Sequence, residues 1–226
     1  MTGASEEGDV PSARVSSDNA YRRLVDAAEG WFAEHGDDYR GAGWTKSQAN
    51  TDTRHQVMLE IVDSSPRQPV ELLDLGCGTS QFYEYITRQG RADEVRYSGL
   101  DLSPVLLDRA RSKFPHISYY NVDLVEGPDA LPSFDYVVIN GIFTFKDGLS
   151  HAAMLDFWRV FIERAFVHAR RGMAFNAMSI EVEWQRDDLF HLPFDVMASF
   201  VAERLSRNFV IRHDYGLYEY TTYVYR

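Results

Sequence analysis

Apolar and polar positions follow two alternating periods along most of this chain. Short apolar runs, rich in β-branched and aromatic residues, predict buried strands at Val70–Leu75, Arg96–Leu100, Ile117–Val122, Tyr136–Asn140 and Met173–Ala177. Apolar residues at helical spacing predict helices at Gln81–Gln89, Pro104–Phe114, His151–Ala169 and Phe194–Leu205. Strands that alternate with helices form a mostly parallel sheet with helices on both faces. We therefore expect an α/β fold.

The two ends of the chain depart from this alternation. Two β-rich runs, Asn208–His213 and Tyr218–Tyr225, close the chain without a helix between them, which predicts a terminal antiparallel hairpin and seven strands in all. Before the first strand, amphipathic helices are predicted at Asp18–Glu34 and Asn50–Val62. We expect residues 1–17 to be a disordered tail, 18–66 a helical cap, and 67–226 the core, with a lid insertion near 179–193.

A glycine turn follows the first predicted strand. The strand Val70–Leu75 leads into Gly76-Cys77-Gly78 and then into a helix. A buried strand that feeds a glycine turn and a helix N-terminus allows backbone N–H groups to approach a nucleotide-like ligand. The third glycine of the dinucleotide fingerprint would fall at Gln81, which argues against a pyrophosphate. An NAD-dependent oxidoreductase therefore stays open only as an alternative.

Carboxylates occur at matching places on three successive strands. Asp74 lies inside the first strand, Asp101 ends the second and Asp123 follows the third. With the glycine turn, this pattern resembles the class I S-adenosylmethionine (SAM)-dependent methyltransferase family, whose core has a Rossmann-like seven-stranded sheet. The resemblance covers roughly residues 70–177. It implies that SAM is the cofactor and that one set of residues contacts it: Asp74, Gly76, Cys77, Gly78, Asp101, Leu102, Asp123, Leu124 and Asn140.

The resemblance also implies a role for each carboxylate. Asp74 would support the glycine turn and the amino-acid end of SAM, and Asp101 would accept hydrogen bonds from the ribose hydroxyls. Asp123 would accept from the adenine amino group while Leu124 covers the ring. Simpler interpretations stay open, because strand-end aspartates also cap helices and stabilise surface turns.

The predicted cap carries two further candidates for the cofactor site. An arginine can pair with a carboxylate through two parallel hydrogen bonds, so Arg54 is a candidate partner for the methionine end of SAM. A cation over an aromatic ring is attracted to it, so Trp44 is a candidate neighbour of the sulfonium. The alternative makes Trp44 a loop anchor and Arg54 a surface charge.

The predicted lid holds the candidates for acid–base chemistry. His191, Asp188 and Glu183 lie between the fifth strand and the next helix. Each is able to act as a base that removes a proton from the substrate group that receives the methyl. A lone histidine is more often structural, and the charges of such a loop are often solvated. The spacing of Asp187, Asp188 and His191 is too weak a pattern for a metal site, and we expect no metal.

The amino-acid composition limits the classes of substrate and binding partner that we expect. The 226 residues carry a formal charge of −11, which opposes a nucleic-acid substrate, and the single cysteine excludes an internal disulfide. No membrane span or secretory signal is visible, so we expect a cytoplasmic protein with no membrane partner. We expect methyl transfer to a small molecule, on a hydroxyl of a sugar or specialised metabolite. Alternatives are N-methylation of a small amine and a non-catalytic SAM-binding protein; a protein substrate is not excluded.

Overall fold

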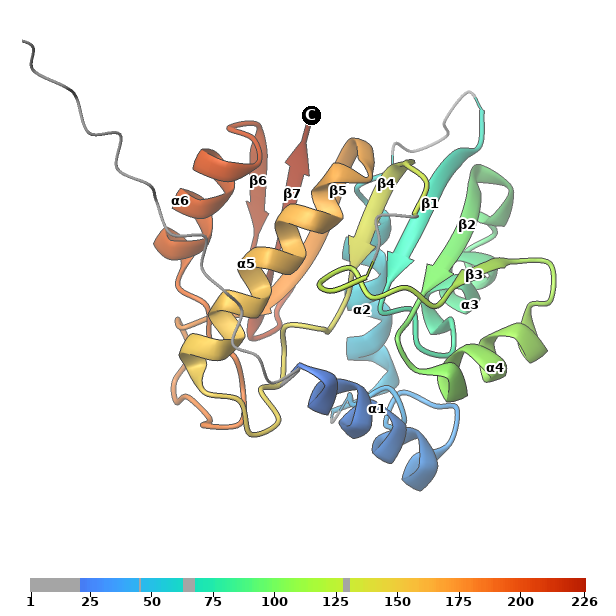
Figure 1. The fold of residues 1–226 in the computed structure, drawn as a ribbon, viewed down its shortest axis with the longest axis horizontal. Helices are drawn as coiled ribbons and strands as arrows, with labels where there is room; N and C mark the ends of the chain where they lie inside the picture. Colours follow the sequence, from blue (N-terminus) through green and yellow to red (C-terminus); the bar gives the residue numbers. More distant parts are fainter. Residues whose placement is uncertain (1–20, 45, 63–67, 128–130) are drawn as a thin grey trace, which may run out of the picture.

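A seven-stranded sheet forms the centre of the computed structural model, which describes residues 21–44, 46–62, 68–127 and 131–226. The strand order is β3-β2-β1-β4-β5-β7-β6, and β7 runs antiparallel to both of its neighbours, β5 and β6 (Figure 1). The strands are β1 (Val70–Leu75), β2 (Val95–Leu100), β3 (Ser118–Tyr120), β4 (Phe134–Ile139), β5 (Ala169–Met178), β6 (Phe209–Arg212) and β7 (Glu219–Tyr225). The predicted α/β class and the terminal antiparallel hairpin are confirmed.

The helices also agree with the sequence pattern to within a few residues. They are α1 (Arg22–His35), α2 (Gln48–Leu59), α3 (Gln81–Arg88), α4 (Pro104–Lys113), α5 (His151–Val167) and α6 (Phe194–Arg204), with a short 3-10 turn η1 at Ala92–Glu94. At α4, the Ser103 hydroxyl accepts a hydrogen bond from the Leu106 N–H, and Pro104 follows at the first helical position. The helix α5 ends earlier than predicted, because Ala169 already pairs with Phe134 in the sheet.

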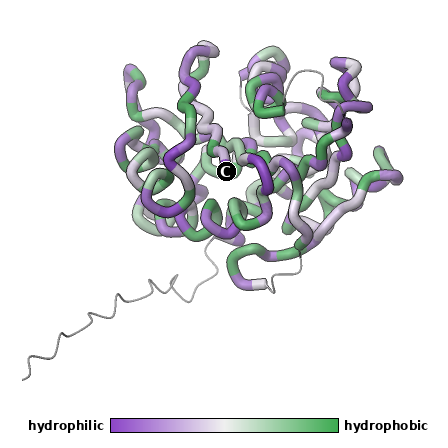
Figure 2. Tube along the Cα trace, turned by 90° about the horizontal axis from the view of Figure 1, so that it is seen from above, coloured by the Kyte–Doolittle hydropathy of each residue, from purple (hydrophilic) through white to green (hydrophobic). Residues whose placement is uncertain are grey.

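Two apolar clusters cover the two faces of the sheet. Successive side chains of a strand point to opposite faces. Leu73 of β1 accordingly joins the cluster that includes Trp158 of α5, whereas Leu72 joins the cluster that includes Met58 of α2 and Ile86 of α3. Figure 2 shows hydrophobic and hydrophilic stretches alternating along the trace. Each fully buried leucine stabilises the fold by roughly 1.5–3 kcal/mol, so both helical layers are firmly attached.

The order of the strands creates a crevice at one edge of the sheet. The chain leaves β1 for β2 and β3 on one side, and then returns to β4 on the other side of β1. Ligands of open α/β sheets bind at such a switch point, outside the carboxyl ends of the strands. The helix α1 lies beyond those ends (Figure 1). None of the helices within the described residues is long and apolar enough to cross a membrane.

Candidate functional site

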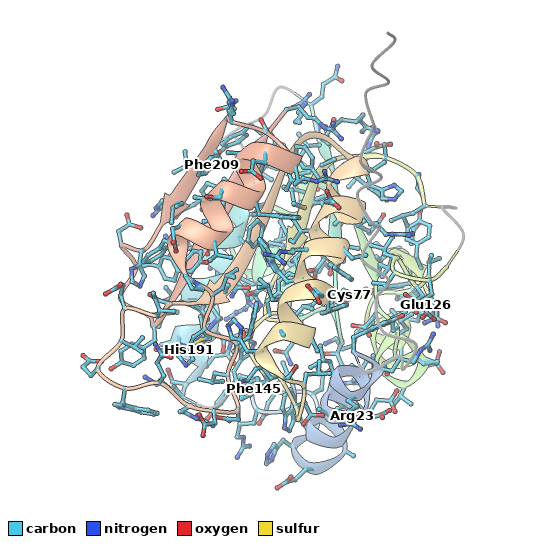
Figure 3. All side chains as sticks on the ribbon, turned by 60° about the vertical axis from the view of Figure 1, so that its left-hand side comes forward. Arg23, Cys77, Glu126, Phe145, His191 and Phe209 are labelled. Carbon is cyan, nitrogen blue, oxygen red and sulfur yellow. The ribbon has the colours of Figure 1, made fainter. Side chains whose placement is uncertain are left out.

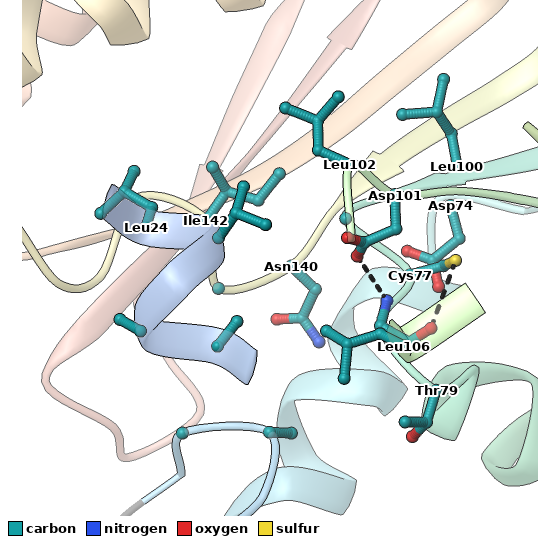
Figure 4. A pocket seen from close by; sticks show the side chains of 18 of the residues that line it. Leu24, Asp74, Cys77, Thr79, Leu100, Asp101, Leu102, Leu106, Asn140 and Ile142 are labelled. Carbon is teal, nitrogen blue, oxygen red and sulfur yellow. Dashed lines mark hydrogen bonds between the residues drawn. The ribbon is translucent and has the colours of Figure 1, made fainter. Parts of the chain in front are cut away.

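A cavity of about 210 Å³ lies at the carboxyl ends of β1, β2 and β4 (Figure 4). Its wall brings together residues from the glycine turn, the end of β2, the loop after β4, and the N-terminal helices. Most of the predicted cofactor residues contribute to this wall: Asp74, Gly76, Cys77, Gly78, Asp101, Leu102, Leu124, Asn140 and Trp44. Two of them, Asp123 and Arg54, do not.

The glycine turn is shaped to bring backbone close to a ligand. Gly76 and Gly78 have positive φ angles of 75° and 52°, which glycine adopts without strain. The N–H groups of Gly76 and Cys77 both donate to the carbonyl oxygen of Leu100, at 2.8 and 3.0 Å, and so tie the turn to β2. A Cβ at Gly76 would lie 2.6 Å from Cδ1 of Ile142, whereas a Cβ at Gly78 would meet nothing within 4 Å. The open side of the turn is therefore at Gly78.

Asp101 has the free acceptor capacity that a sugar diol needs. One carboxylate oxygen accepts a hydrogen bond from the Gly78 N–H at 2.8 Å, and the other accepts from the Ser103 N–H at 2.9 Å. Burial raises the pKa of Asp101, and these backbone N–H groups oppose that rise. The Leu102 N–H also interacts with this carboxylate, which has about four lone-pair positions in all, so acceptor capacity remains. Asp101 thus supports the local turn and still fits the predicted ribose role.

Asp74 is buried beneath the glycine turn. The Tyr97 hydroxyl donates a 2.6 Å hydrogen bond to its carboxylate. Burial raises the pKa of Asp74 to about 7, with a further rise from the charge of Asp101, while the bond from Tyr97 lowers it. The carboxyl group is therefore held close to the balance between its neutral and charged forms at neutral pH. A cationic ammonium group placed near it would favour the charged form.

Asp123 stands in a different environment from the one predicted. Its Oδ2 accepts from the Tyr21 hydroxyl at 2.8 Å and from Nη2 of Arg22 at 2.9 Å. Its Oδ1 accepts from the N–H groups of Val125 and Glu126. Four hydrogen bonds use the lone pairs of a carboxylate in full. In this arrangement Asp123 stabilises a turn and anchors α1. Its role as acceptor for the adenine amino group stays a prediction, and its neighbour Leu124 lines the cavity.

Arg54 also differs from the prediction. Its Nε lies 2.7 Å from Oε1 of Glu219, and its guanidinium carbon lies 4.2 Å from the ring centre of Trp44. Arg54 is thus neither a surface charge nor part of the cavity wall, because it lies behind Trp44. Trp44 itself forms the wall, and it packs so closely on Gly141 that a Cβ there would lie 2.7 Å from the indole ring. Nothing in the local sequence marks Glu219 as the partner of Arg54.

The three predicted bases lie outside the cavity. His191 is buried, with Nδ1 2.6 Å from the carbonyl oxygen of Ser179, and its Nε2 accepts from the Arg186 N–H at 3.3 Å. Asp188 pairs with Arg186, and Glu183 is exposed to solvent. Figure 3 shows His191 well apart from Cys77 of the glycine turn. In this structure the ring of His191 is bonded to the backbone of the segment 179–193, and the acid–base role of these three residues stays a prediction.

His55 was missed by the sequence analysis. It projects from α2, lines the cavity, and is only 4% exposed. Its ring lies 5.5 Å from that of Phe82 and 5.6 Å from that of Tyr85, both on α3. The spacing of the apolar residues in α2 did not single out His55, because it gave no reason to expect a polar side chain at the ligand. Among the described residues, no cluster of three His, Cys, Asp or Glu side chains is arranged to hold a metal.

Fold and site can now be compared with known proteins. In the sheet, β7 lies antiparallel between β5 and β6, a glycine turn follows β1, and a buried aspartate with acceptor capacity follows β2. A family model described as a methyltransferase domain matches residues 72–163. This match supports a SAM-dependent methyltransferase with SAM as its cofactor. The open side at Gly78 and the free acceptor positions of Asp101 fit that cofactor.

One protein sequence and several solved structures are similar to this chain. It is 29% identical over 173 residues to Rv1506c of Mycobacterium tuberculosis, a protein named as a methyltransferase, and the match covers 74% of this chain and 98% of the relative. Among solved structures, it is similar to the N-methyltransferase NodS of Bradyrhizobium japonicum bound to S-adenosylhomocysteine (TM-score 0.61, 18% identity, 92% and 99% of the two chains). It is also similar to the 1,6-didemethyltoxoflavin-N1-methyltransferase of Burkholderia thailandensis (TM-score 0.61, 15% identity, 97% and 93%). The two structural likenesses concern the fold.

Proposed function

We propose that this enzyme methylates a small-molecule acceptor, on a hydroxyl group of a sugar or specialised metabolite. One observation carries the proposal: five aromatic side chains line the same cavity as the predicted cofactor residues. This aromatic section of the wall comes from α1 and the residue before it, the loop after β4, and α5: Tyr21, Trp31, Phe145, Phe157 and Phe161. A compact, partly apolar cavity favours a small acceptor over a macromolecule. The net charge of −11 also opposes a nucleic-acid acceptor.

An amine acceptor is the second candidate. The 1,6-didemethyltoxoflavin enzyme acts at a nitrogen of a small molecule that is bound in its structure, and NodS is named an N-methyltransferase. The cavity of this chain favours the same choice in one respect. None of the three predicted bases lines it, and an amine that arrives unprotonated needs no base.

The residues of this chain would act by positioning. SAM, when bound, supplies a methyl group that its sulfonium already activates. Asp101 and the glycine turn would hold the nucleoside, while Trp44 and the aromatic section would exclude water and orient the acceptor. Holding donor and acceptor at near-attack geometry can account for roughly 7–11 kcal/mol of a barrier. Positioning by these residues would therefore account for much of the rate enhancement.

Isothermal titration tests the cofactor part of the proposal. We expect SAM and S-adenosylhomocysteine to bind the purified protein and NAD not to bind. Asp101→Ala should weaken both ligands at least tenfold, because it removes the acceptors for the ribose. Asp93→Ala is the matched control, since Asp93 is exposed on η1 and does not line the cavity. Binding of NAD alone would support the oxidoreductase instead.

A mass-spectrometric screen tests the acceptor. Hydroxylated sugars, hydroxylated aromatic metabolites and small amines are each incubated with the protein and SAM. A gain of one methyl group on a hydroxyl compound supports the proposal. Methylation restricted to amines would replace it with the second candidate, and methylation restricted to proteins or nucleic acids would overturn it.

A further inference from the structure

The cavity wall is poor in positive charge. Among the described residues that line it there is no lysine and no arginine, and two of them, Asp74 and Asp101, are acidic. SAM and S-adenosylhomocysteine both end in an amino acid, whose carboxylate must find hydrogen-bond donors when it leaves water. Arg54, the predicted donor, is engaged with Glu219 outside the wall. Another residue has to meet this carboxylate.

Several polar side chains of the wall are already engaged elsewhere. The Thr79 hydroxyl donates to Asp37 at 2.6 Å, and the Gln81 amide donates to the Asp38 carbonyl oxygen at 2.7 Å. The Tyr21 hydroxyl donates to Asp123. Each of these groups would have to break an existing hydrogen bond in order to serve the ligand. They are therefore poor candidates.

His55 differs from them in its hydrogen bonding. Its buried Nδ1 has no hydrogen-bond partner among the described residues. The rings of Phe82 and Tyr85 hold it in place from α3, the helix that begins three residues after Gly78. A donor fixed in this way loses little entropy on binding.

We propose that His55 donates a hydrogen bond to the carboxylate at the amino-acid end of the cofactor. The inference rests on the proposed cofactor site and names the group that His55 recognises there. An unpaired buried nitrogen is costly, so a ligand that satisfies it recovers that cost on binding. Burial lowers the pKa of His55 to about 3, so the ring is neutral in the free protein and donates through its single N–H.

Two ligands isolate this contact. S-adenosylhomocysteine carries the amino-acid end, and 5′-methylthioadenosine keeps the adenosine and sulfur but lacks the amino acid. We expect His55→Leu to weaken S-adenosylhomocysteine at least tenfold in isothermal titration and to change the affinity for 5′-methylthioadenosine less than twofold. His55→Asn keeps a short N–H donor and should restore part of the lost affinity. His213→Leu, at an exposed histidine outside the cavity, is the control.

Thermal unfolding without ligand separates binding from a structural role. Replacing an unsatisfied buried polar group by an apolar one is neutral or stabilising. We therefore expect His55→Leu to keep or raise the Tm of the free protein. A lower Tm with equal weakening of both ligands would overturn the inference, as would unchanged affinity for S-adenosylhomocysteine. If the wild-type protein bound neither ligand, the cofactor site itself would fail, which is a distinct result.

Discussion

Arg54 and Glu219 form a buried ion pair, with Nε of the arginine 2.7 Å from Oε1 of the glutamate. The opposite charges of the two side chains attract each other across this distance. Burial raises the pKa of Glu219, and Arg54 opposes that rise. The guanidinium also stacks on Trp44, so the pair supports one wall of the cavity from behind.

Breaking this pair should destabilise the fold strongly. Arg54→Met leaves Glu219 buried without a counter-charge, and the loss of one partner of a buried pair costs about 3–5 kcal/mol. We expect urea unfolding at neutral pH to show a loss of this size, and the double variant Arg54→Met/Glu219→Gln to recover most of it. Arg111→Met, which breaks an exposed pair with Asp108, is the control and should change stability by less than about 1 kcal/mol. A double variant no more stable than the single one would contradict the pairing.

Asp74 should make stability depend on pH. Its pKa is raised to about 7, so the folded chain retains a proton between about pH 4 and 7 that the unfolded chain releases. The free energy of unfolding therefore falls as the pH rises through this window and stays low above it. Asp74→Asn removes this penalty without removing an acceptor for Tyr97. At pH 8 it should stabilise the ligand-free protein by up to about 4 kcal/mol, with little effect at pH 4. Equal effects in urea unfolding at both pH values would contradict this assignment.

The same substitution should weaken the cofactor. Asp74→Asn removes a negative charge next to the predicted place of the amino-acid end of SAM, whose ammonium group is cationic. We expect tighter folding and weaker S-adenosylhomocysteine binding in the same variant, measured by isothermal titration at pH 8. Unchanged affinity would leave Asp74 a structural role alone.

His191 should behave as a structural residue. Its two ring nitrogens bond to the backbone of Ser179 and Arg186, so His191→Ala loses both bonds and leaves a cavity. We expect a loss of about 2–4 kcal/mol in unfolding free energy and no change in S-adenosylhomocysteine affinity. Asp188→Ala, at an exposed carboxylate of the same segment, is the control and should change neither quantity. Full stability in His191→Ala would contradict the buried contacts.

Gly76 should tolerate no side chain. Its φ of 75° disfavours a Cβ, and that Cβ would lie 2.6 Å from Ile142. Gly76→Ala should therefore cost more than Gly90→Ala, where φ is also positive but nothing lies within 4 Å of the Cβ. The φ angle alone costs about 1–2 kcal/mol, and the clash at Gly76 adds to it. Urea unfolding compares the two variants, and equal losses would show that Ile142 moves aside freely.

Local patterns in the sequence predicted much of the fold. The period of the apolar residues predicted the strands and helices to within a few residues, and Ser103 with Pro104 marked the start of α4. The position of the cavity could also be inferred from the strand pattern. The carboxyl ends of parallel strands meet at one edge of the sheet, and this brings Asp74, Gly78 and Asp101 together. These features depend on spacing within a strand–turn–helix unit, which the sequence displays directly.

Contacts between distant segments were decided by the tertiary structure alone. Asp123 has the expected strand-end position, but α1 arrives from about a hundred residues away and occupies its oxygens through Tyr21 and Arg22. Two neighbouring residues of α2 show the same effect. Arg54, which the sequence suggested for the cofactor site, pairs with Glu219 on β7, whereas His55 lines the cavity. The sequence by itself determined the sheet, the glycine turn and the carboxylate that follows β2. Which side chain of the cap meets the ligand depends on how a helix is rotated against a sheet, and packing among residues far apart in the chain sets that rotation.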